Sequence, residues 1–356
     1  MKIVLLAYLH GFGGAEKQLI LLANAMAARG HNVILISIGV DNTVYVLDER
    51  IKYKFIPDRN TGLLRVLYRY NDIKKALRKE MPDITINFWF QSAYLTALMP
   101  KDITGQVLYA ERGDPGDVEY SGTLGLVRKL ILPRIDKFVF QSKGAQSFFD
   151  NAVIARSTII PNPVSLNIKY ADVTERRKVI VTVGRLHSQK NQKLLIDAFA
   201  LIAAEFPEYT LEIYGDGELR IELQNHITEL NLSNRIFLKG TSARIHSLIY
   251  DASLFVLSSD YEGLPNALIE AMALGIPCVS TDCKPGGARE IIQDKVNGYI
   301  VPRKNAVILG NTIKKLLKDK KKLCIFSLNA KKSMKNFNSD IVYDKWEKFL
   351  GDKIKC

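Results

Sequence analysis

The sequence has no long hydrophobic run, and this absence argues against a membrane-spanning protein. None of its 356 residues lies in an apolar stretch that approaches the roughly 18 to 20 residues needed to cross a bilayer as a helix. The first residues, MKIVLLAYLHG, have the pattern of a short buried strand, and no small-residue cleavage site follows them. We therefore expect a cytoplasmic protein without a transmembrane segment.

Cysteine and histidine are also scarce, which argues against a metal centre and a disulfide scaffold. The four cysteines, Cys278, Cys283, Cys324 and Cys356, form no CxxC pair and no metal-spaced cluster with the five histidines. The GxGxxG spacing of dinucleotide-binding enzymes is missing as well. We predict no resident metal or cofactor, and an NAD-dependent oxidoreductase is the weakest alternative.

The chain is basic, and its charge is unevenly distributed. The formal net charge of +13 divides into +6 over residues 1–165 (21 Lys and Arg against 15 Asp and Glu), −1 over 166–310 (16 against 17) and +8 over 311–356 (13 against 5). Nucleic-acid binding, an anionic membrane surface and plain solubility would each account for basic flanks. Charge alone leaves all three open.

What the sequence does have is a repeated alternation of strand-like and helical segments. The first half carries KIVLLAY, NVILISI, ITINFWF, QVLYAER and KFVFQS, with helical periodicity over residues 15–29 and 64–79. After a segment rich in Pro, Asn and charge, the alternation restarts with VIVTVGR, YTLEIYG, RIFLKG, LFVLSS and PCVSTD. This order predicts an α/β fold of two doubly wound parallel sheets, divided near residue 168, with a ligand cleft between them.

Three glycine-containing motifs follow predicted strands. HGFGGAE, residues 10–16, opens a helix as phosphate-binding loops do, although a tight turn would explain it about as well. GRLHSQKNQ, residues 184–192, brings two cations, Arg185 and Lys190, to a strand end, where they could neutralise a diphosphate. YGDGE, residues 214–218, is a further strand-to-helix turn, for which a structural role is at least as good an explanation.

The segment EGLPNALIE, residues 262–270, has a carboxylate at each end. Pro265 suits the first turn of a helix, and the apolar run behind it contains good helix formers. Glu262 should then lie before the helix and Glu270 inside it. The unpaired N–H groups of a helix start suit an anionic or hydroxyl-rich ligand, whereas two exposed acids on an ordinary amphipathic helix are the structural alternative.

Taken together and in this order, the motifs resemble those of the family 4 retaining glycosyltransferases of the GT-B fold. The resemblance extends over nearly the whole chain, through GGAE, GRLHSQKN, YGDGE, SSDYEGLPNALIEAMALGIPCVSTD and GGAREII, and the E-x7-E spacing around GLP is its most specific part. It implies an acceptor-binding Rossmann-like domain over residues 1–168 and a nucleotide-sugar-binding one over 169–335. A C-terminal helix over 336–356 is expected to pack back on the first domain.

The resemblance also implies roles for individual residues. The loop that begins with Glu262 would surround the donor sugar and phosphates, and Glu270 would hold the ribose hydroxyls, since a carboxylate can accept two such hydrogen bonds. Arg185 and Lys190 would stabilise the departing diphosphate. The implied nucleotide-sugar site comprises Gly13, Gly14, Gly184, Gly215, Gly217, Gly263, Leu264, Pro265, Asn266 and Glu270.

The acceptor side departs from the pattern of the family. Many relatives carry a histidine near the end of the strand that QVLYAERGDP represents, whereas this chain has Glu111, Arg112 and Asp114. The ERGDP segment is similar to that of relatives that transfer N-acetylhexosamine or hexose units in bacterial surface glycans. We predict that Arg112 and Asp114 contact the donor sugar or the acceptor, with a structural salt bridge as the alternative.

These inferences predict a retaining hexosyltransferase that moves a sugar from a nucleotide donor, a UDP-sugar, to a lipid-linked glycan in O-antigen or capsule biosynthesis. A nucleotide-sugar epimerase of the same fold is the alternative, and a nucleic-acid-binding protein would explain the charge but not the paired acids. Residues 63–79, LLRVLYRYNDIKKALRK, have the pattern of a basic amphipathic helix. With the basic cluster 314–335, this helix predicts reversible binding to the anionic inner face of the cell membrane, unless it packs on the N-terminal sheet.

Overall fold

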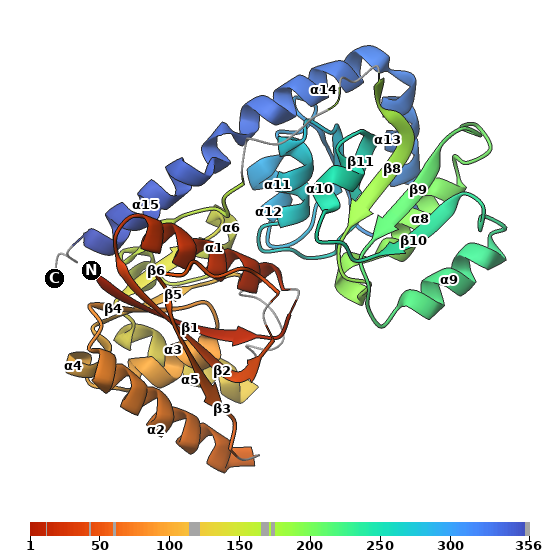
Figure 1. Cartoon of the computed structure of the whole chain (residues 1–356). Helices are drawn as coiled ribbons and strands as arrows, with labels where there is room; N and C mark the ends of the chain where they lie inside the picture. The colour runs from red at the N-terminus through yellow and green to blue at the C-terminus, as the bar shows by residue number, and fades with distance from the viewer. Residues whose placement is uncertain are drawn as a thin grey trace. The chain divides into compact units, whose positions relative to one another are not determined.

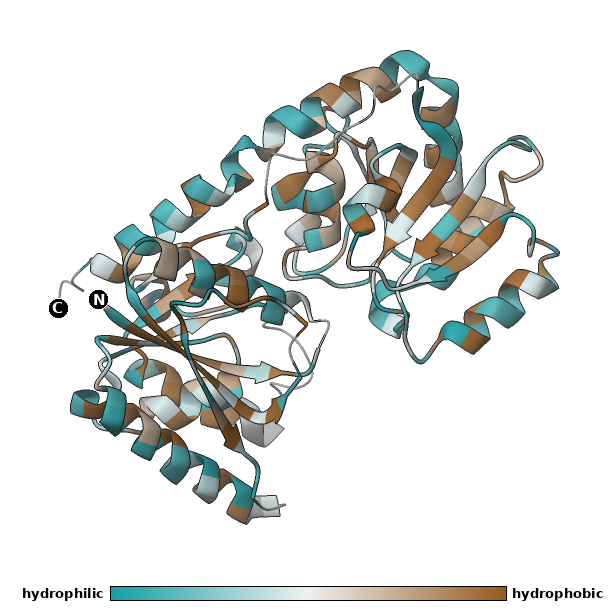
Figure 2. Ribbon diagram, in the orientation of Figure 1, coloured by the Kyte–Doolittle hydropathy of each residue, from teal (hydrophilic) through white to brown (hydrophobic). Residues whose placement is uncertain are grey.

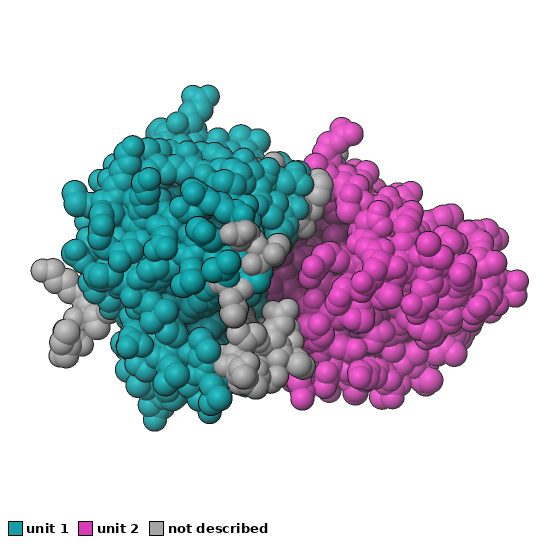
Figure 3. All heavy atoms as spheres, turned by 90° about the horizontal axis from the view of Figure 1, so that it is seen from below, with its two compact units in different colours: residues 1–163, 340–356 teal, residues 164–339 magenta. Residues whose placement is uncertain are grey.

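The computed structural model describes residues 1–11, 13–42, 44–59, 62–113, 122–164, 171 and 175–352. The chain divides into two compact units, drawn in different colours in Figure 3: unit 1 comprises Met1–Pro163 and Asp340–Cys356, and unit 2 comprises Val164–Ser339. Each unit contains a parallel sheet with helices on both faces (Figure 1). The division at Pro163 lies close to residue 168, where the change of composition predicts it.

Unit 1 contains a seven-stranded sheet with the order β3-β2-β1-β4-β5-β6-β7. Its strands are β1 (Lys2–Leu9), β2 (Asn32–Asp41), β3 (Lys52–Pro57), β4 (Ile84–Asn87), β5 (Gln106–Ala110), β6 (Lys137–Phe140) and β7 (Ser157–Ile159). Its helices are α1 (Gly14–Ala28), α2 (Gly62–Glu80), α3 (Phe90–Ala97), α4 (Lys101–Thr104), α5 (Gly122–Ile131), η2 (Leu132–Arg134), α6 (Lys143–Gln146), α7 (Asn151–Ile154) and α15 (Ser339–Gly351). The strand order reverses between β1 and β4, which is the topological switch point of the sheet.

The strands of unit 1 are buried on both faces, so they appear as continuous apolar runs in the sequence. Side chains of β1 alternate between two clusters: Leu5 packs with α1 on one face, and Leu6 packs with α2 on the other. Figure 2 shows the same strands as hydrophobic bands beneath helices whose outer faces are hydrophilic. This double burial is why the strands could be predicted from the sequence.

The C-terminal helix α15 belongs to the core of unit 1. Its apolar side chains join the cluster that β1 and α1 form; they are Val342, Tyr343, Trp346 and Leu350. The buried ammonium group of Lys137, on β6, donates to the carbonyl oxygens of Phe349 at 2.7 Å, Leu350 at 3.1 Å and Asp352 at 2.6 Å. One lysine therefore satisfies carbonyl groups that the end of the helix leaves without intrahelical partners.

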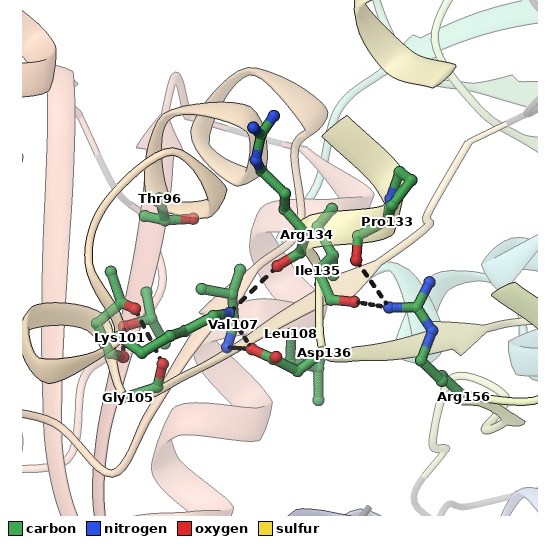
Figure 4. Close-up of polar contacts among 12 residues, drawn as sticks. Thr96, Lys101, Gly105, Val107, Leu108, Pro133, Arg134, Ile135, Asp136 and Arg156 are labelled. Carbon is green, nitrogen blue, oxygen red and sulfur yellow. Dashed lines mark hydrogen bonds and ion pairs between the residues drawn. The ribbon is translucent and has the colours of Figure 1, made fainter. Parts of the chain in front are cut away.

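Polar contacts connect the segments at the N-terminal ends of β5 and β6 (Figure 4). The Asp136 carboxylate accepts hydrogen bonds from the backbone N–H of Val107 at 2.7 Å and from the Lys101 ammonium. The Arg156 guanidinium donates to the carbonyl oxygens of Ile135 and, at 3.3 Å, Pro133. These side chains have structural partners at the N-terminal ends of the strands, whereas the sequence motifs follow the C-terminal ends.

Unit 2 contains a six-stranded sheet with the order β10-β9-β8-β11-β12-β13. Its strands are β8 (Arg177–Val183), β9 (Thr210–Tyr214), β10 (Ile236–Gly240), β11 (Ala252–Leu257), β12 (Cys278–Thr281) and β13 (Tyr299–Val301). Its helices are η4 (Ser188–Lys190), α8 (Gln192–Ala200), α9 (Arg220–Glu229), α10 (Ile245–Ile249), α11 (Asn266–Ala273), α12 (Gly287–Ile291), α13 (Ala306–Lys318), α14 (Lys320–Ser333) and η5 (Met334–Phe337). The switch point of this sheet lies between β8 and β11.

The structure differs from the predicted elements at the edges of the sheets. The strands β3, β7 and β13 were not predicted, because each is an edge strand that is either short or largely exposed. The run ITINFWF contains both β4 and the start of α3. Helix α11 begins at Asn266, one residue later than expected, with Pro265 as its N-cap. No helix in the described part of the chain is long and apolar enough to span a membrane.

Candidate functional site

Lys190 and Glu262 form an ion pair beyond the C-terminal ends of β8 and β11, the two central strands of unit 2. Lys190 ends the turn that follows β8, and Glu262 follows β11, the neighbouring strand. The Lys190 ammonium donates a hydrogen bond to Glu262 Oε1, and the Ser259 hydroxyl donates to the same oxygen at 2.7 Å. The lysine and glutamate side chains are only 18% and 9% exposed, so this ion pair is sheltered from bulk water at the switch point, where doubly wound sheets bind ligands.

The turn that carries Lys190 also holds Arg185 in a fixed backbone position. The Leu186 N–H donates to the Asp216 carbonyl oxygen at 2.9 Å, and the Gln192 amide donates to the Arg185 carbonyl oxygen at 2.8 Å. The Arg185 side chain is exposed, and its guanidinium has no hydrogen bond or ion pair with any residue that the structure describes. The turn therefore presents one sheltered cation and one open cation where β8 ends.

Three of the predicted glycines shape this turn by close packing. Gly215 has a φ of +138°, and a Cβ atom there would lie 1.9 Å from the Gly184 carbonyl oxygen. A Cβ atom at Gly217 would lie 2.4 Å from the Leu186 carbonyl oxygen. At Gly184 itself, a Cβ atom would press against the Lys190 side chain at 3.3 Å. These contacts give the glycines a role in positioning the two cations.

The loop that begins with Glu262 is held by backbone contacts. The Glu262 N–H donates to the Lys284 carbonyl oxygen at 2.6 Å. Gly263 packs so closely on Gly287 that a Cβ atom at Gly287 would lie 2.3 Å from the Gly263 carbonyl oxygen. Leu264 is only 6% exposed and packs into the apolar core beneath the loop. The sheltered carboxylate is therefore fixed by its own backbone as well as by Lys190.

The second acid of the motif lies inside α11 and faces a histidine. Pro265 caps the helix, Asn266 is its first residue, and Glu270 follows in the next turn. The Glu270 Oε2 atom lies 3.2 Å from Nε2 of His246, which comes from α10. This imidazole nitrogen is buried and makes no aligned hydrogen bond within the described residues. Glu262 and Glu270 thus occupy different surroundings, one against an ammonium and the other against an imidazole.

Sequence reasoning missed two residues that contact the paired acids, Ser259 and His246. Ser259 lies three residues before Glu262 in a strand-end segment, so its place in the motif was a usable signal. His246 lies on a five-residue helix that is distant from Glu270 in the sequence, and no spacing rule connects them. Only the packing of α10 on α11 brings that pair together.

In unit 1, the GGAE motif forms the turn between β1 and α1. Gly13 is the N-cap of α1 and Gly14 is the first residue of the helix. The buried Glu16 carboxylate accepts hydrogen bonds from the backbone N–H groups of His10 at 3.0 Å and Gly11 at 3.1 Å. The acid of the motif thus stabilises the turn, and glycines form the start of the helix.

Arg112 lies in a polar and aromatic environment within unit 1. Its guanidinium donates to Asn162 Oδ1 at 3.0 Å and lies 4.4 Å from the ring centroid of Phe88 and 5.4 Å from that of Trp346. Burial lowers the pKa of Arg112 to about 9, and the neighbouring Glu111 carboxylate opposes this shift. Arg112 thus has structural partners, as the salt-bridge alternative expects, but they are the Asn162 amide and two aromatic rings rather than a carboxylate.

In the rest of the ERGDP segment, Glu111 is a buried acid with several partners, whereas Asp114 lies outside the described residues. Glu111 accepts hydrogen bonds from the Tyr109 hydroxyl at 2.7 Å and the Gly113 N–H at 3.0 Å, and Arg128 lies 3.4 Å away. Glu111 is 2% exposed, so its partners are all internal. Asp114, for which we predict contact with the sugar or acceptor, lies outside the described residues.

Among the described residues, no three His, Cys, Asp or Glu side chains form a group that could hold a metal ion. Cys278 and Cys283 are free and buried, and Cys324 is free and partly exposed. Burial raises the pKa of Cys283 to about 12, which keeps its thiol protonated at neutral pH. The two buried cysteines pack in the apolar core of unit 2.

Two family profiles match the chain, and they meet at residues 167–168, a few residues after the boundary between the units at Pro163. The profile of glycosyl transferases group 1 matches residues 167–333, and that of glycosyltransferase family 4 matches residues 12–168. An uncharacterized glycosyltransferase from Haemophilus influenzae is 25% identical over 95% of this chain and 96% of its own length.

A second relative and a solved structure extend over the whole chain. The relative is the Campylobacter jejuni GalNAc-α-(1→4)-GalNAc-α-(1→3)-diNAcBac-PP-undecaprenol α-1,4-N-acetyl-D-galactosaminyltransferase, which is 23% identical over 99% of both chains. The crystal structure of Anabaena HepE with UDP and glucose superposes with a TM-score of 0.83 at 21% identity, over 99% of this chain and 100% of that one.

The fold is therefore GT-B, the fold of glycosyltransferases built from two Rossmann-like domains. The protein belongs to the family 4, group 1 glycosyltransferases and is an enzyme that transfers glycosyl groups.

Proposed function

We propose that the protein transfers a sugar, with retention of its anomeric configuration, from a UDP-sugar to a glycan on a lipid carrier during assembly of a bacterial surface polysaccharide. The observation that carries this proposal is the sheltered Lys190–Glu262 pair beside the open Arg185 at the β8–β11 switch point. UDP in the Anabaena structure supports the donor, and the undecaprenyl-linked glycan in the name of the Campylobacter relative supports the acceptor.

The donor would be held by residues from both central strand ends of unit 2. The Glu270 carboxylate would accept hydrogen bonds from the ribose hydroxyls, and the loop around Glu262 would enclose the sugar. Arg185 would form charge-assisted hydrogen bonds with the diphosphate, and Lys190 would share its charge between the diphosphate and Glu262. Gly13 and Gly14 would allow close approach of backbone to phosphate. Two cations at the leaving group make a metal ion unnecessary in this proposal.

The chemical step would break the bond between the anomeric carbon and the diphosphate oxygen. The acceptor hydroxyl would attack from the face that the diphosphate leaves, and a diphosphate oxygen would take the hydroxyl proton. As the bond breaks, negative charge grows on the leaving group, so Arg185 and Lys190 would bind the transition state more strongly than the ground state. Retention follows because the new bond forms on the face of the old one.

Transfer is favoured over the two alternatives that the sequence left open. An epimerase of the same fold would need no glycan acceptor, whereas the Campylobacter relative is named for transfer to one. Nucleic-acid binding would explain the net charge of +13, but it would not explain the paired acids Glu262 and Glu270. The family profiles also match enzymes that transfer sugars rather than either alternative.

A panel of nucleotide sugars tests the proposal directly. We expect one donor, a UDP-sugar, to raise the melting temperature of the protein and to be hydrolysed slowly without acceptor, because a bound cognate ligand stabilises the folded state. Replacement of Lys190 by Gln should abolish the hydrolysis, whereas Lys193→Gln, a change to an exposed lysine on α8, should leave it intact. If no nucleotide sugar gives both effects, the proposal is wrong.

We also propose that the enzyme binds an anionic membrane surface through α2. Ile73 and Leu77 are fully buried against the sheet, so the C-terminal half of the helix packs as the structural alternative requires. In the N-terminal half, Leu64 and Leu67 are 56% and 59% exposed, beside the exposed Arg65. An apolar group with neighbouring positive charge suits the interface of an anionic bilayer.

Sedimentation with liposomes tests the membrane proposal. Arg69 is excluded from the variants because its guanidinium binds Asp58 and therefore has a structural role. We expect Leu64→Ser with Leu67→Ser to reduce capture by anionic liposomes, and higher salt to reduce it further, since screening acts over roughly 10 Å at 0.1 M. The control, Leu201→Ser with Ile221→Ser, changes two comparably exposed residues of unit 2. Equal capture of both variants and the parent would contradict the proposal.

A further inference from the structure

His246 is held against Glu270 by the packing of two helices in unit 2. Helix α10, which carries His246, follows β10, and α11, which carries Glu270, follows β11. Ile249 of α10 is only 2% exposed and belongs to the same apolar cluster as Leu268 and Met272 of α11. Residues three apart share one face of a helix, so the burial of Ile249 turns His246 toward α11. The approach of the two polar side chains is therefore a consequence of core packing.

The imidazole of His246 approaches one oxygen of the Glu270 carboxylate. Nε2 lies 3.2 Å from Oε2, which is within reach of a hydrogen bond, but the two groups are not aligned and Nε2 has no hydrogen-bond partner in the part of the chain that the structure describes. The side chains of His246 and Glu270 are 37% and 16% exposed. Contacts of this kind are often poorly aligned in a free enzyme and tighten when the ligand binds. The pair is thus partly sheltered from water and still accessible to a ligand.

Anchoring one oxygen of Glu270 would fix the direction of its carboxylate. An ionised carboxylate offers about four lone-pair directions on its two oxygens, so one that accepts from an imidazole can still accept from hydroxyl groups. Nε2 of His246 can donate both in the imidazolium form and in the neutral tautomer that carries its hydrogen there. A glutamate side chain has several rotatable bonds, and holding it in one rotamer before the ligand binds removes an entropy cost from binding. A contact with His246 therefore favours a ligand that needs the carboxylate in this direction.

We propose that His246 is a positioning residue that directs the Glu270 carboxylate at the ribose of the donor, and that the enzyme thereby selects ribonucleotide sugars over 2′-deoxyribonucleotide sugars. This inference rests on the proposed function, in which Glu270 accepts hydrogen bonds from the ribose hydroxyls. A 2′-deoxyribose lacks one of these hydroxyls, so a carboxylate that is fixed toward both loses a partner. A mobile carboxylate would turn to water instead, and the selectivity would be small.

Calorimetry of the full chain with UDP and with 2′-deoxy-UDP tests the inference. The parent should bind UDP at least about tenfold more tightly, as expected for one hydrogen bond to a charged group. His246→Ala should weaken UDP binding by about tenfold and 2′-deoxy-UDP binding much less, so that the selectivity falls to about twofold. His246→Gln should restore part of the selectivity, because the side-chain amide of Gln can also donate to a carboxylate.

Two controls separate positioning from other roles. His226→Ala removes another histidine of unit 2 that lies against a carboxylate, that of Asp197 at 2.5 Å, and it should change neither affinity. In a Glu270→Gln background, His246→Ala should have little further effect, because a positioning residue acts through the group that it holds. A further loss of UDP affinity in that background would show that the imidazole binds the nucleotide itself, and it would overturn the positioning role.

The selectivity between the two nucleotides decides the outcome. The inference is wrong if the parent binds UDP and 2′-deoxy-UDP equally, or if His246→Ala weakens both by the same factor, which would leave the histidine only a structural role. Binding of 2′-deoxy-UDP by each variant shows that it is folded. In either case the parent still binds UDP, so the proposed function stands. Failure of the parent to bind either nucleotide would contradict the proposed function and, with it, this inference.

Discussion

At the scale of the residue, the two acids of EGLPNALIE have different partners, although the sequence places them in one short motif. Glu262 accepts hydrogen bonds from Lys190 and Ser259, whereas Glu270 faces His246. Replacement of Glu270 by Gln should therefore weaken UDP binding by roughly 1.5 to 3 kcal/mol, the worth of a hydrogen bond to a charged group. Glu262→Gln should impair turnover more than UDP binding, because Glu262 begins the loop that we propose encloses the donor sugar. Titration calorimetry and donor hydrolysis measure the two effects, and equal losses of UDP affinity would contradict this division.

The open guanidinium of Arg185 should matter most in the transition state, when charge develops on the departing diphosphate. Replacement by Ala should lower kcat at least about 100-fold, a loss comparable with that of one preorganised oxyanion donor. Chelation by EDTA should leave the rate unchanged, because the two cations of the turn neutralise the leaving group. Initial rates with the cognate donor measure both effects. Loss of activity on chelation, with recovery on addition of magnesium, would show that the reaction needs a metal ion.

At the scale of the element, the turn after β8 depends on the turn after β9. A Cβ atom at Gly215 would clash with the Gly184 carbonyl oxygen at 1.9 Å, so Gly215→Ala should displace the turn that carries Arg185 and Lys190. We expect a large loss of donor affinity in calorimetry. Gly30→Ala is a matched control, since Gly30 also has a positive φ but has open space around it. An unchanged affinity in the Gly215 variant would mean that the turn can relax.

The attachment of α15 to unit 1 should depend on Lys137. Replacement by Met would remove the donor for three carbonyl groups at the end of the helix, and each carbonyl left without a partner costs about 1 to 3 kcal/mol. The thermal unfolding midpoint should fall by several degrees. Lys345→Met, a change to an exposed lysine on the same helix, should have little effect. Equal midpoints for the two variants would show that apolar packing alone holds the helix.

The elements that could be predicted from the sequence are the ones buried on both faces. The central strands of both sheets carry continuous apolar runs, so their type and order follow from pattern alone. The edge strand β3 lacks that signal because four of its six residues are exposed. The start of α11 at Asn266 differs from expectation by one residue, because a proline that precedes a helix fits the cap as well as the first turn.

At the scale of the whole molecule, the alternation of strand-like and helical segments predicted the two parallel sheets, and the motifs in their fixed order predicted the family; the structure and the family profiles confirm both. The motifs assigned Lys190 and Glu262 to one nucleotide-sugar site, but they did not predict the direct contact between the two side chains. The approach of His246 to Glu270 was not predicted either, because it depends on packing between two helices that share no local pattern. Sequence therefore predicts which loops carry the site residues, and tertiary contacts decide how their side chains pair.

One measurement tests the central claim most directly. The enzyme is incubated with a UDP-sugar labelled in the sugar and with a glycan on undecaprenyl diphosphate, and NMR identifies where the label goes and its anomeric configuration. We predict that the label moves to the lipid-linked glycan with the configuration that it had in the donor, while UDP is released. Label that stays in the nucleotide fraction as an epimer, or that reaches the glycan with inverted configuration, would contradict the account.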